Sequence, residues 1–269
     1  MKFNPRIAIC RFAYGGSESS DEENWVIQTT AHCAKNKISL THCVYDDTPA
    51  PMVRNRAVKD CLEAGIDLMF FLDNDMFPDI EPDSNFFDSA IQFYIERFYK
   101  EPTVIAAPYC GPPPKEMVYI FRWRGYQSDN PNPDFDLKMY TREEAAERRG
   151  REAVAALPTG LMAIDARIFT GFDVKDEKGD TYTVGLRPPY FYYEYKDEFQ
   201  TDKASTEDVT FSRDVSLLYG QYGLQVVWVD WDSWAGHWKR KLVSKPVKID
   251  PGGLAKLFKE AVAGAQRKE

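Results

Sequence analysis

The sequence predicts an α/β fold built on a mostly parallel, twisted sheet with helices on both faces. Over roughly the first hundred residues, short apolar runs alternate with amphipathic segments of helical spacing. One of these runs, residues 66–72, is almost continuously apolar, which is typical of a strand buried on both faces of a parallel sheet. It stops abruptly at Asp73-Asn74-Asp75. In such folds ligands bind at the carboxyl ends of the strands, so we expect a site at this edge.

Each element expected in the first half has a local signal. An apolar run of strand length opens the fold, and a Gly-Gly-Ser loop separates it from an acidic helix start. The second helix ends at Gly65, a residue suited to helix ends. We expect strands at residues 6–10, 38–45, 66–72 and 103–107, and helices beginning at 21–23 and spanning 52–64 and 86–99.

The second half is less regular, and its elements are separated by longer polar stretches. We expect strands at residues 117–123, 161–164 and 224–228, helices at 141–149, 207–219 and 254–266, and a long aromatic insertion at 172–200. The chain has no internal repeat. Its 269 residues, 43% of them hydrophobic, are enough for one sizeable core. We therefore expect one domain over residues 1–269.

Composition narrows the class of protein. A formal net charge of -8 disfavours a surface built throughout to neutralise a nucleic-acid backbone, although basic residues gather between Lys239 and Lys248. The 5 cysteines form no CxxC pair, and their odd number favours a reducing compartment. The sequence shows no apolar run of membrane-spanning length and no cleavable signal pattern. We therefore expect a cytoplasmic protein with no membrane partner.

Asp73 and Asp75 stand two residues apart at the end of the buried strand. In an extended backbone both carboxylates project to the same side. There they can hold a hard cation, Mg²⁺ or Mn²⁺, together with the phosphate oxygens of a substrate. Such a cation neutralises charge on a departing diphosphate. The alternative is a plain turn, because Asp and Asn also favour strand ends by bonding their own backbone.

Two further pairs of residues are expected to reach the same crevice. Arg54 and Asn55 begin a helix that leads into the buried strand, where arginine can clamp phosphate or orient Asp73. Glu207 and Asp208 open a later helix. Acids at a helix start have a structural explanation as capping groups. In the functional interpretation Asp208 takes the proton of an acceptor hydroxyl as general base, while Glu207 serves the helix end.

His237 lies in an aromatic stretch that also contains Trp231, Trp234 and Trp238. A lone histidine is often purely structural. In this position it can also complete the coordination shell begun by Asp75, with its other ring nitrogen held by a neighbouring group.

The order of these motifs resembles the GT-A glycosyltransferases over residues 6–238, and in particular bacterial and phage-type relatives of family 2. The resemblance is carried by the Arg-Asn helix, the strand ending in Asp-x-Asp, the Thr159-Gly160 turn, the Pro-Pro-Tyr-Phe loop at 188–193 with its Glu-Asp helix, and the late histidine. It implies a GT-A, Rossmann-like sheet. It also implies a nucleotide-sugar-binding half at 1–115, an acceptor and catalytic half at 116–240, and a tail helix at 241–269.

The resemblance also implies roles for individual residues. Expected metal ligands are Asp73, Asp75 and His237, and Asp73 also contacts the donor ribose or a metal-bound water. Expected donor-binding residues are Arg11, Phe12, Arg54, Asn55, Asp73, Asn74 and Gly160, and expected catalytic residues are Asp208 and Glu207. The first strand departs from the family pattern, because Arg11-Phe12-Ala13-Tyr14 replaces Pro-x-Tyr-Asn. The processive signature Gln-x-x-Arg-Trp is missing, which favours a single transfer.

The sequence therefore predicts a metal-dependent, hexosyltransferase-type enzyme that moves one sugar from a nucleoside diphosphate sugar, expected to be a UDP-sugar, to an acceptor hydroxyl. The acceptor stays open between a carbohydrate and a hydroxylated base of phage-type DNA. Two other classes remain as alternatives. One is a sugar-phosphate nucleotidyltransferase, for which Gly15-Gly16-Ser17 is a poor phosphate loop. The other is a non-catalytic module that binds carbohydrate or nucleic acid through its aromatic loop and basic tail.

Overall fold

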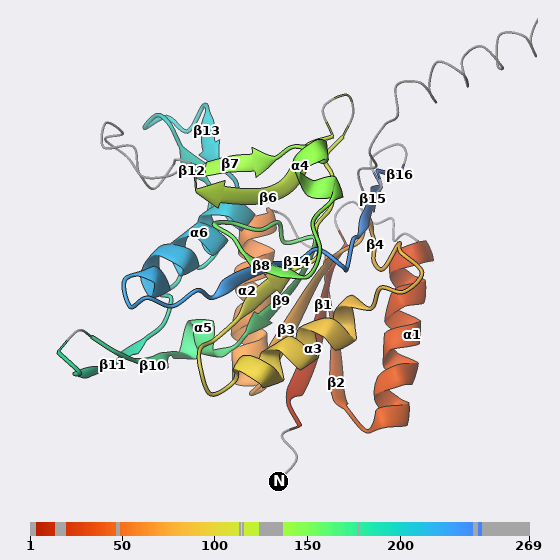
Figure 1. Cartoon of the computed structure of the whole chain (residues 1–269), viewed down its shortest axis with the longest axis horizontal. Coiled ribbons are helices and arrows are strands. Elements are labelled where there is room, and N and C mark those ends of the chain that lie inside the picture. The colour runs from red at the N-terminus through yellow and green to blue at the C-terminus, as the bar shows by residue number, and fades with distance from the viewer. Residues whose placement is uncertain are drawn as a thin grey trace, which may run out of the picture.

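A seven-stranded sheet lies at the centre of the fold (Figure 1). The computed structural model describes residues 4–13, 20–46, 49–112, 114, 116–123, 137–176, 178–238 and 242–243. The strand order is β2-β1-β3-β9-β5-β14-β8, and all strands except β9 and β8 run in one direction. The strands are β1 (Arg6–Phe12), β2 (Ser39–Tyr45), β3 (Leu68–Asp73), β5 (Val104–Ala106), β8 (Arg151–Ala153), β9 (Leu161–Asp165) and β14 (Val227–Asp230).

Helices cover both faces of this sheet, as the alternation of buried residues requires. In β1, Ile7 and Ile9 pack with α1 (Ser20–Asn36) and α3 (Phe86–Arg97), whereas Ala8, Cys10 and Phe12 pack with α2 (Ala50–Glu63) and α6 (Glu207–Gly220). The short α5 (Arg167–Thr170) joins the second group. The result is three layers with two apolar interfaces.

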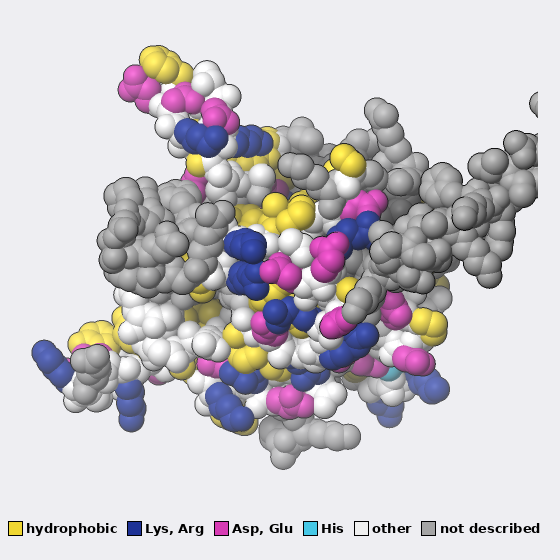
Figure 2. Space-filling model, turned by 45° about the horizontal axis from the view of Figure 1, so that its top comes forward, with side chains coloured by type: hydrophobic (Ala, Val, Ile, Leu, Met, Phe, Trp, Pro, Cys, Tyr) yellow, Lys and Arg dark blue, Asp and Glu magenta, His cyan; other side chains and the backbone are white. Residues whose placement is uncertain are grey.

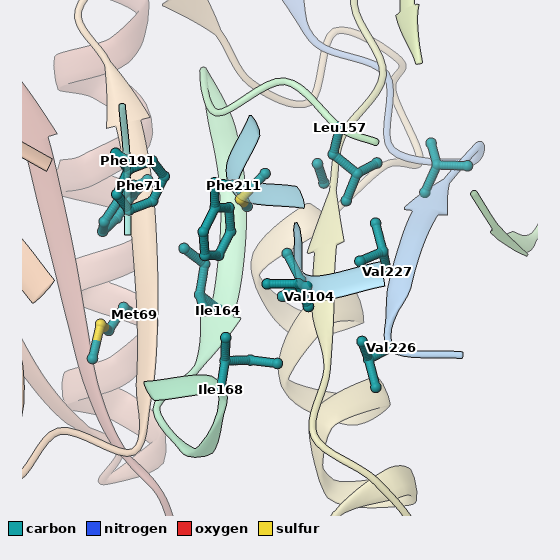
Figure 3. Packing of buried hydrophobic residues seen from close by; sticks show 14 of the residues in the cluster. Met69, Phe71, Val104, Leu157, Ile164, Ile168, Phe191, Phe211, Val226 and Val227 are labelled. Atoms are coloured by element: carbon teal, nitrogen blue, oxygen red, sulfur yellow. The ribbon is translucent and has the colours of Figure 1, made fainter. Parts of the chain in front are cut away.

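The interface with α2 and α6 contains a column of aromatic rings (Figure 3). The ring of Phe191 lies between Phe71 of β3, at 5.6 Å between centroids, and Phe211 of α6, at 4.4 Å. Phe191 belongs to the predicted Pro-Pro-Tyr-Phe loop, so this loop is partly a component of the core.

The path of the chain creates a switch point beside β1. From β1 the chain crosses to β2 on one side and then returns to β3 on the other. Crossovers that leave in opposite directions open a crevice at the carboxyl ends of the two strands. Phe12 is paired in register with Asp73 at that end. The fold therefore places the Asp-x-Asp segment in the crevice that the sequence predicted.

Smaller sheets stand above the carboxyl ends of the main strands (Figure 1). Two of them are the β6–β7 pair and the β12–β13 pair, and a third joins β16, β15 and β4. Their members are β4 (Met76–Phe77), β6 (Val118–Trp123), β7 (Leu137–Tyr140), β12 (Glu194–Tyr195), β13 (Lys203–Ser205), β15 (Gly236–Trp238) and β16 (Leu242–Val243). The β10 (Phe172–Lys175) and β11 (Thr181–Val184) hairpin and the helix α4 (Arg142–Ala146) complete the described elements.

The expected α/β class with a mostly parallel sheet is confirmed, and all seven elements expected in the first half form. The second half required corrections. The helix expected at 141–149 ends at Ala146, the strand expected at 224–228 lies at Val227–Asp230, and the expected insertion at 172–200 contains β10, β11 and β12. His237 lies in a strand. Of the expected tail at 241–269, only β16 falls within the described residues.

Two further findings concern the described chain as a whole. All five cysteines are described, and each is a free thiol. Among the helices of the described part of the chain, none is both long enough and apolar enough to cross a bilayer.

Candidate functional site

A cavity of about 610 Å³ lies at the carboxyl ends of the central strands. We call it the acidic cavity. Its walls come from the end of β3, the helices α2 and α6, the β6 hairpin and β15, so segments far apart in the sequence meet there. The lining residues are Arg54, Asp73, Asn74, Asp75, Tyr109, Tyr119, Phe121, Thr159, Thr206, Glu207, Asp208, Val209 and His237.

Asp73 and Asp75 reach this cavity by a different backbone geometry from the one expected. Asp73 is the last residue of β3, whereas Asn74 and Asp75 form a turn before β4. The amide of Asp73 donates to the carbonyl of Gly160 (2.9 Å), and that of Asn74 donates to the carbonyl of Phe12 (3.1 Å). Both carboxylates line one cavity because this turn is fastened on two sides, not because the backbone stays extended.

Strand pairing brings His237 to Asp75. β15 runs antiparallel to β4, with His237 opposite Met76, and the amide of Trp238 donates to the carbonyl of Asp75 (2.7 Å). The side chains then meet, with His237 Nε2 3.1 Å from Asp75 Oδ2. His237 is 6% exposed. A buried imidazole and a half-buried carboxylate thus share one corner of the cavity.

The other side of the His237 ring is held by Tyr109 and Cys110. Nδ1 lies 3.3 Å from the carbonyl of Cys110, and the Tyr109 ring packs edge-on at 4.9 Å between centroids. A carbonyl only accepts hydrogen bonds, so a proton on Nδ1 can be donated to Cys110. With Nδ1 protonated in a neutral ring, Nε2 keeps its lone pair and can share a cation with the Asp75 carboxylate. This is the tautomer and the outer hydrogen bond that a metal-binding histidine uses.

This donor set fits a divalent cation that also binds a substrate. Within the described residues, no three His, Cys, Asp or Glu side chains are grouped so as to hold a metal by themselves. One nitrogen and one carboxylate oxygen therefore form the protein's share at this corner. Mg²⁺ and Mn²⁺ commonly use one or two protein ligands and complete their shells with water and phosphate oxygens.

Arg54 connects the two halves of the chain inside the cavity. Its Nη2 donates to both oxygens of Asp73 (2.9 and 3.0 Å), and its Nη1 donates to Glu207 at the start of α6. Arg54 is only 3% exposed. Burial raises the pKa values of the Asp73 and Glu207 carboxyls above their usual values, and the nearby guanidinium opposes that rise. The expected orientation of Asp73 by Arg54 is therefore present in the structure.

The start of α6 presents two acids with different surroundings. Glu207 is buried against Arg54. In Asp208, Oδ1 accepts from the hydroxyl of Thr206 and from the amide of Val209 (2.9 Å). Its second oxygen, Oδ2, accepts no hydrogen bond from the residues that the structure describes. Both candidate catalytic acids line the cavity, and Asp208 is the more exposed of the two, whereas Glu207 is buried and paired with Arg54.

Four predicted donor-binding residues do not line the acidic cavity. Arg11 points to the α1 face of the sheet, where its Nη2 donates to Glu22 (2.7 Å). Phe12 is fully buried and its ring lies 5.4 Å beneath the Arg54 guanidinium. Phe12 thus supports the floor of the site through Arg54.

The other two predicted donor-binding residues that do not line the acidic cavity are Asn55 and Gly160. The Asn55 amide donates to the carbonyl of Phe191 (2.7 Å), and its oxygen accepts from the amides of Tyr190 (2.8 Å) and Phe191 (3.2 Å). A Cβ at Gly160 would lie 2.7 Å from the Tyr109 hydroxyl. Asn55 therefore anchors the aromatic loop, and Gly160 makes room for Tyr109.

Tyr109, Tyr119, Phe121 and Thr159 line the cavity but were not predicted. Burial raises the pKa of Tyr109 well above its usual value. Tyr109 closely follows the strand expected at 103–107, so strand-end position alone was a signal for it. Tyr119 and Phe121 lie on β6. The position of β6 over the cavity depends on a long connection, so no local sequence pattern indicated that these two residues line it.

Basic and acidic side chains are interspersed over the described surface on this side of the molecule (Figure 2). The basic residues noted between Lys239 and Lys248, the Gly15-Gly16-Ser17 loop, and Tyr14 all lie outside the described residues.

No protein-family model matches the chain, and no curated protein matches it. Among solved structures it is similar to A197 from STIV, with 15% identity, 90% of this chain and 96% of that chain covered, and a TM-score of 0.48. It is also similar to a glycosyltransferase involved in glycosylation of the major capsid of PBCV-1, at 11% identity, 60% of each chain and a TM-score of 0.29. A third is 4-diphosphocytidyl-2C-methyl-D-erythritol synthase from Anaerococcus prevotii, at 12% identity, 78% and 95% coverage, and a TM-score of 0.26. All three TM-scores lie below 0.5, so the function proposed next depends on the geometry of the site.

Proposed function

We propose that this chain is a metal-dependent glycosyltransferase of GT-A type that transfers one sugar from a nucleoside diphosphate sugar, in the first instance a UDP-sugar, to an acceptor hydroxyl. The observation that carries the proposal is the Asp75–His237 pair, which shares one cavity with the Arg54-linked acids and with Asp208. The cavity lies at the switch point of the sheet, where α/β folds bind nucleotides.

Asp75 Oδ2 and His237 Nε2 would hold Mn²⁺ or Mg²⁺, and the cation would supply charge neutralisation for the diphosphate leaving group. The carbonyl of Cys110 keeps the His237 ring turned so that Nε2 faces Asp75. Arg54 holds Asp73 in place by two hydrogen bonds, and Asp73 lines the cavity where it would be available to the donor ribose or to a bound water. Asn74 lines the same wall and adds polar groups beside the donor.

Asp208 is suited to act as general base. Its Oδ1 is held by two hydrogen bonds, which direct Oδ2 to a ligand in the cavity. A carboxylate so placed accepts the proton of the attacking hydroxyl. Glu207 stays paired with Arg54 and keeps the start of α6 in position.

A thermal-shift screen of nucleoside diphosphate sugars tests the proposal. A donor that binds only the folded state at a hundred times its Kd adds about 2.7 kcal/mol of stability. We expect stabilisation by one donor class with Mn²⁺, none with EDTA, and none in Asp75→Ala. Donor binding that ignores EDTA and survives Asp75→Ala contradicts the proposed function.

A further inference from the structure

A second hollow of about 330 Å³ lies beside the acidic cavity, and we call it the side cavity. It is bordered by β6, β7, β13 and the first turns of α6, and β6, β7 and β13 lie near the top of Figure 1. Its lining residues are Phe121, Leu137, Lys203, Ala204, Ser205, Thr206, Val209 and Arg213. Phe121, Thr206 and Val209 line both cavities, so the two hollows are adjacent.

Asp208 lines the acidic cavity next to residues that the two cavities share. In sequence it falls between Thr206 and Val209, two of the residues shared by both cavities. Those same two residues occupy its Oδ1 through the Thr206 hydroxyl and the Val209 amide. A molecule in the side cavity would reach Oδ2 by extending a hydroxyl across the shared border into the acidic cavity, where the donor would lie.

The lining chemistry suits a sugar ring. Phe121 and Leu137 are half-buried and offer apolar surface for the C–H face of a ring. Ser205 and Thr206 offer hydroxyl groups, and the Ser205 side chain makes no hydrogen bond to the described part of the chain. Small-molecule sites span about 300–1,000 Å³, so a volume at the lower end fits a single ring better than an extended chain.

The charges of the side cavity argue against a nucleic-acid strand as its occupant. The guanidinium of Arg213 donates to both carboxylate oxygens of Glu194 (2.7 and 2.8 Å) and to one of Asp214 (2.8 Å), so its charge is neutralised. Among the described residues of the lining, the remaining cation is Lys203, whose ammonium packs 3.6 Å from the centroid of the Tyr193 ring. Binding a nucleic-acid backbone takes several phosphate contacts to Lys and Arg.

We propose that the side cavity is the acceptor subsite and that it takes one sugar ring bearing the reactive hydroxyl. This inference rests on the function proposed above. The hydroxyl oxygen bonds to C1 of the donor sugar as the bond from C1 to the diphosphate oxygen breaks. The hydroxyl proton passes to Asp208, and the electron pair of the broken bond leaves with the nucleoside diphosphate.

Ala204→Trp tests this placement, because Ala204 is an exposed residue of β13 that lines the side cavity, and an indole there fills the cavity without entering the core. Glu198→Trp is the matched control, since Glu198 is exposed on the same hairpin and lines neither cavity. Each protein is assayed with Mn²⁺ and the donor selected by thermal shift. Donor hydrolysis is measured alone, and transfer is measured to para-nitrophenyl hexosides and to duplex DNA carrying 5-hydroxymethylcytosine.

We expect transfer to at least one hexoside by the unaltered protein and by Glu198→Trp. Ala204→Trp should lose transfer at least tenfold while its donor hydrolysis stays within twofold. Unchanged transfer by Ala204→Trp overturns the subsite. Donor hydrolysis without transfer to any hexoside, or transfer to the modified DNA alone, overturns the acceptor class. A protein that neither binds nor hydrolyses any nucleoside diphosphate sugar refutes the proposed function itself, and the subsite with it.

Discussion

His237 and Asp75 are 162 positions apart in the chain, yet His237 Nε2 lies 3.1 Å from Asp75 Oδ2. Backbone pairing between β15 and β4 produces this meeting, and the Cys110 carbonyl turns the ring toward it. We expect His237→Gln to weaken Mn²⁺-dependent donor binding at least about tenfold, because ligand and near-ligand changes in metal sites have effects of that size. Calorimetric titration measures it. His32→Gln, at a half-exposed position on α1, is the control, and equal affinities for the two variants contradict the role of His237.

Replacement of Arg54 by Met should destabilise the fold strongly. The change leaves the half-buried carboxylate of Asp73 and the buried carboxylate of Glu207 without their cation. Removing one partner of a buried ion pair costs about 3 to 5 kcal/mol. Urea unfolding measures the loss, with Arg56→Met as the control because Arg56 is exposed on the same helix. A loss of unfolding free energy below about 1 kcal/mol, which is the range of surface ion pairs, means that the ion pairs of Arg54 contribute little to stability.

Asn55→Ala should release the aromatic loop from α2. The Asn55 side chain satisfies the backbone amides of Tyr190 and Phe191, and each donor left unsatisfied on burial costs about 1 to 3 kcal/mol. We expect a loss of at least about 2 kcal/mol in unfolding free energy, together with faster amide exchange at residues 190 and 191. Asn36→Ala, exposed at the end of α1, should change neither quantity. Exchange rates that stay the same in Asn55→Ala argue against the anchor.

Gly160→Ala should cost about 1 to 3 kcal/mol through overpacking. The new Cβ would lie 2.7 Å from the Tyr109 hydroxyl and 2.8 Å from the Met76 sulfur. Adding Tyr109→Phe removes the closest atom and should restore part of the stability, which a double-mutant cycle measures. Gly220→Ala is the control, because nothing lies within 4 Å of the Cβ built at that residue. Strict additivity of the two changes contradicts the proposed clash.

Stability should depend on pH through Glu207. Burial raises its pKa above the usual value of 4.5, so between the two values the folded state binds more protons than the unfolded state. The unfolding free energy of the unaltered protein, relative to Glu207→Gln, should therefore rise as the pH falls through the raised pKa and level off below 4.5. Urea unfolding from pH 7 to pH 4 tests this sign. If the unfolding free energy relative to Glu207→Gln falls on acidification instead, the ion pair with Arg54 outweighs the effect of burial on the Glu207 pKa.

The sequence predicted those parts of the site that local patterns specify. Asp73 follows a fully apolar strand, and Glu207 and Asp208 open a helix, so their positions follow from neighbours in the chain. Arg11 does not line the acidic cavity, which the sequence alone did not indicate, because strand alternation separates two faces without naming them. Its buried partner Glu22 lies on α1, and only the packing of that helix decides the face.

Long-range pairing explains what the sequence did not predict. Whether Asn55 would meet a phosphate or the backbone of Phe191 depends on the path of a loop 136 residues away. The antiparallel β9 is short and apolar like its neighbours, and nothing in residues 161–165 tells its direction or its place between β3 and β5.

The position of β9 also affects the order in which the molecule can be made. During synthesis, β3 and β5 leave the ribosome long before residues 161–165, and until those residues follow, the facing edges of both strands lack their hydrogen-bonding neighbour. Open edges of apolar strands are templates for aggregation. We therefore expect the newly made amino-terminal half to be prone to aggregation until β9 is added, and a fragment ending near residue 115 to be insoluble when expressed alone.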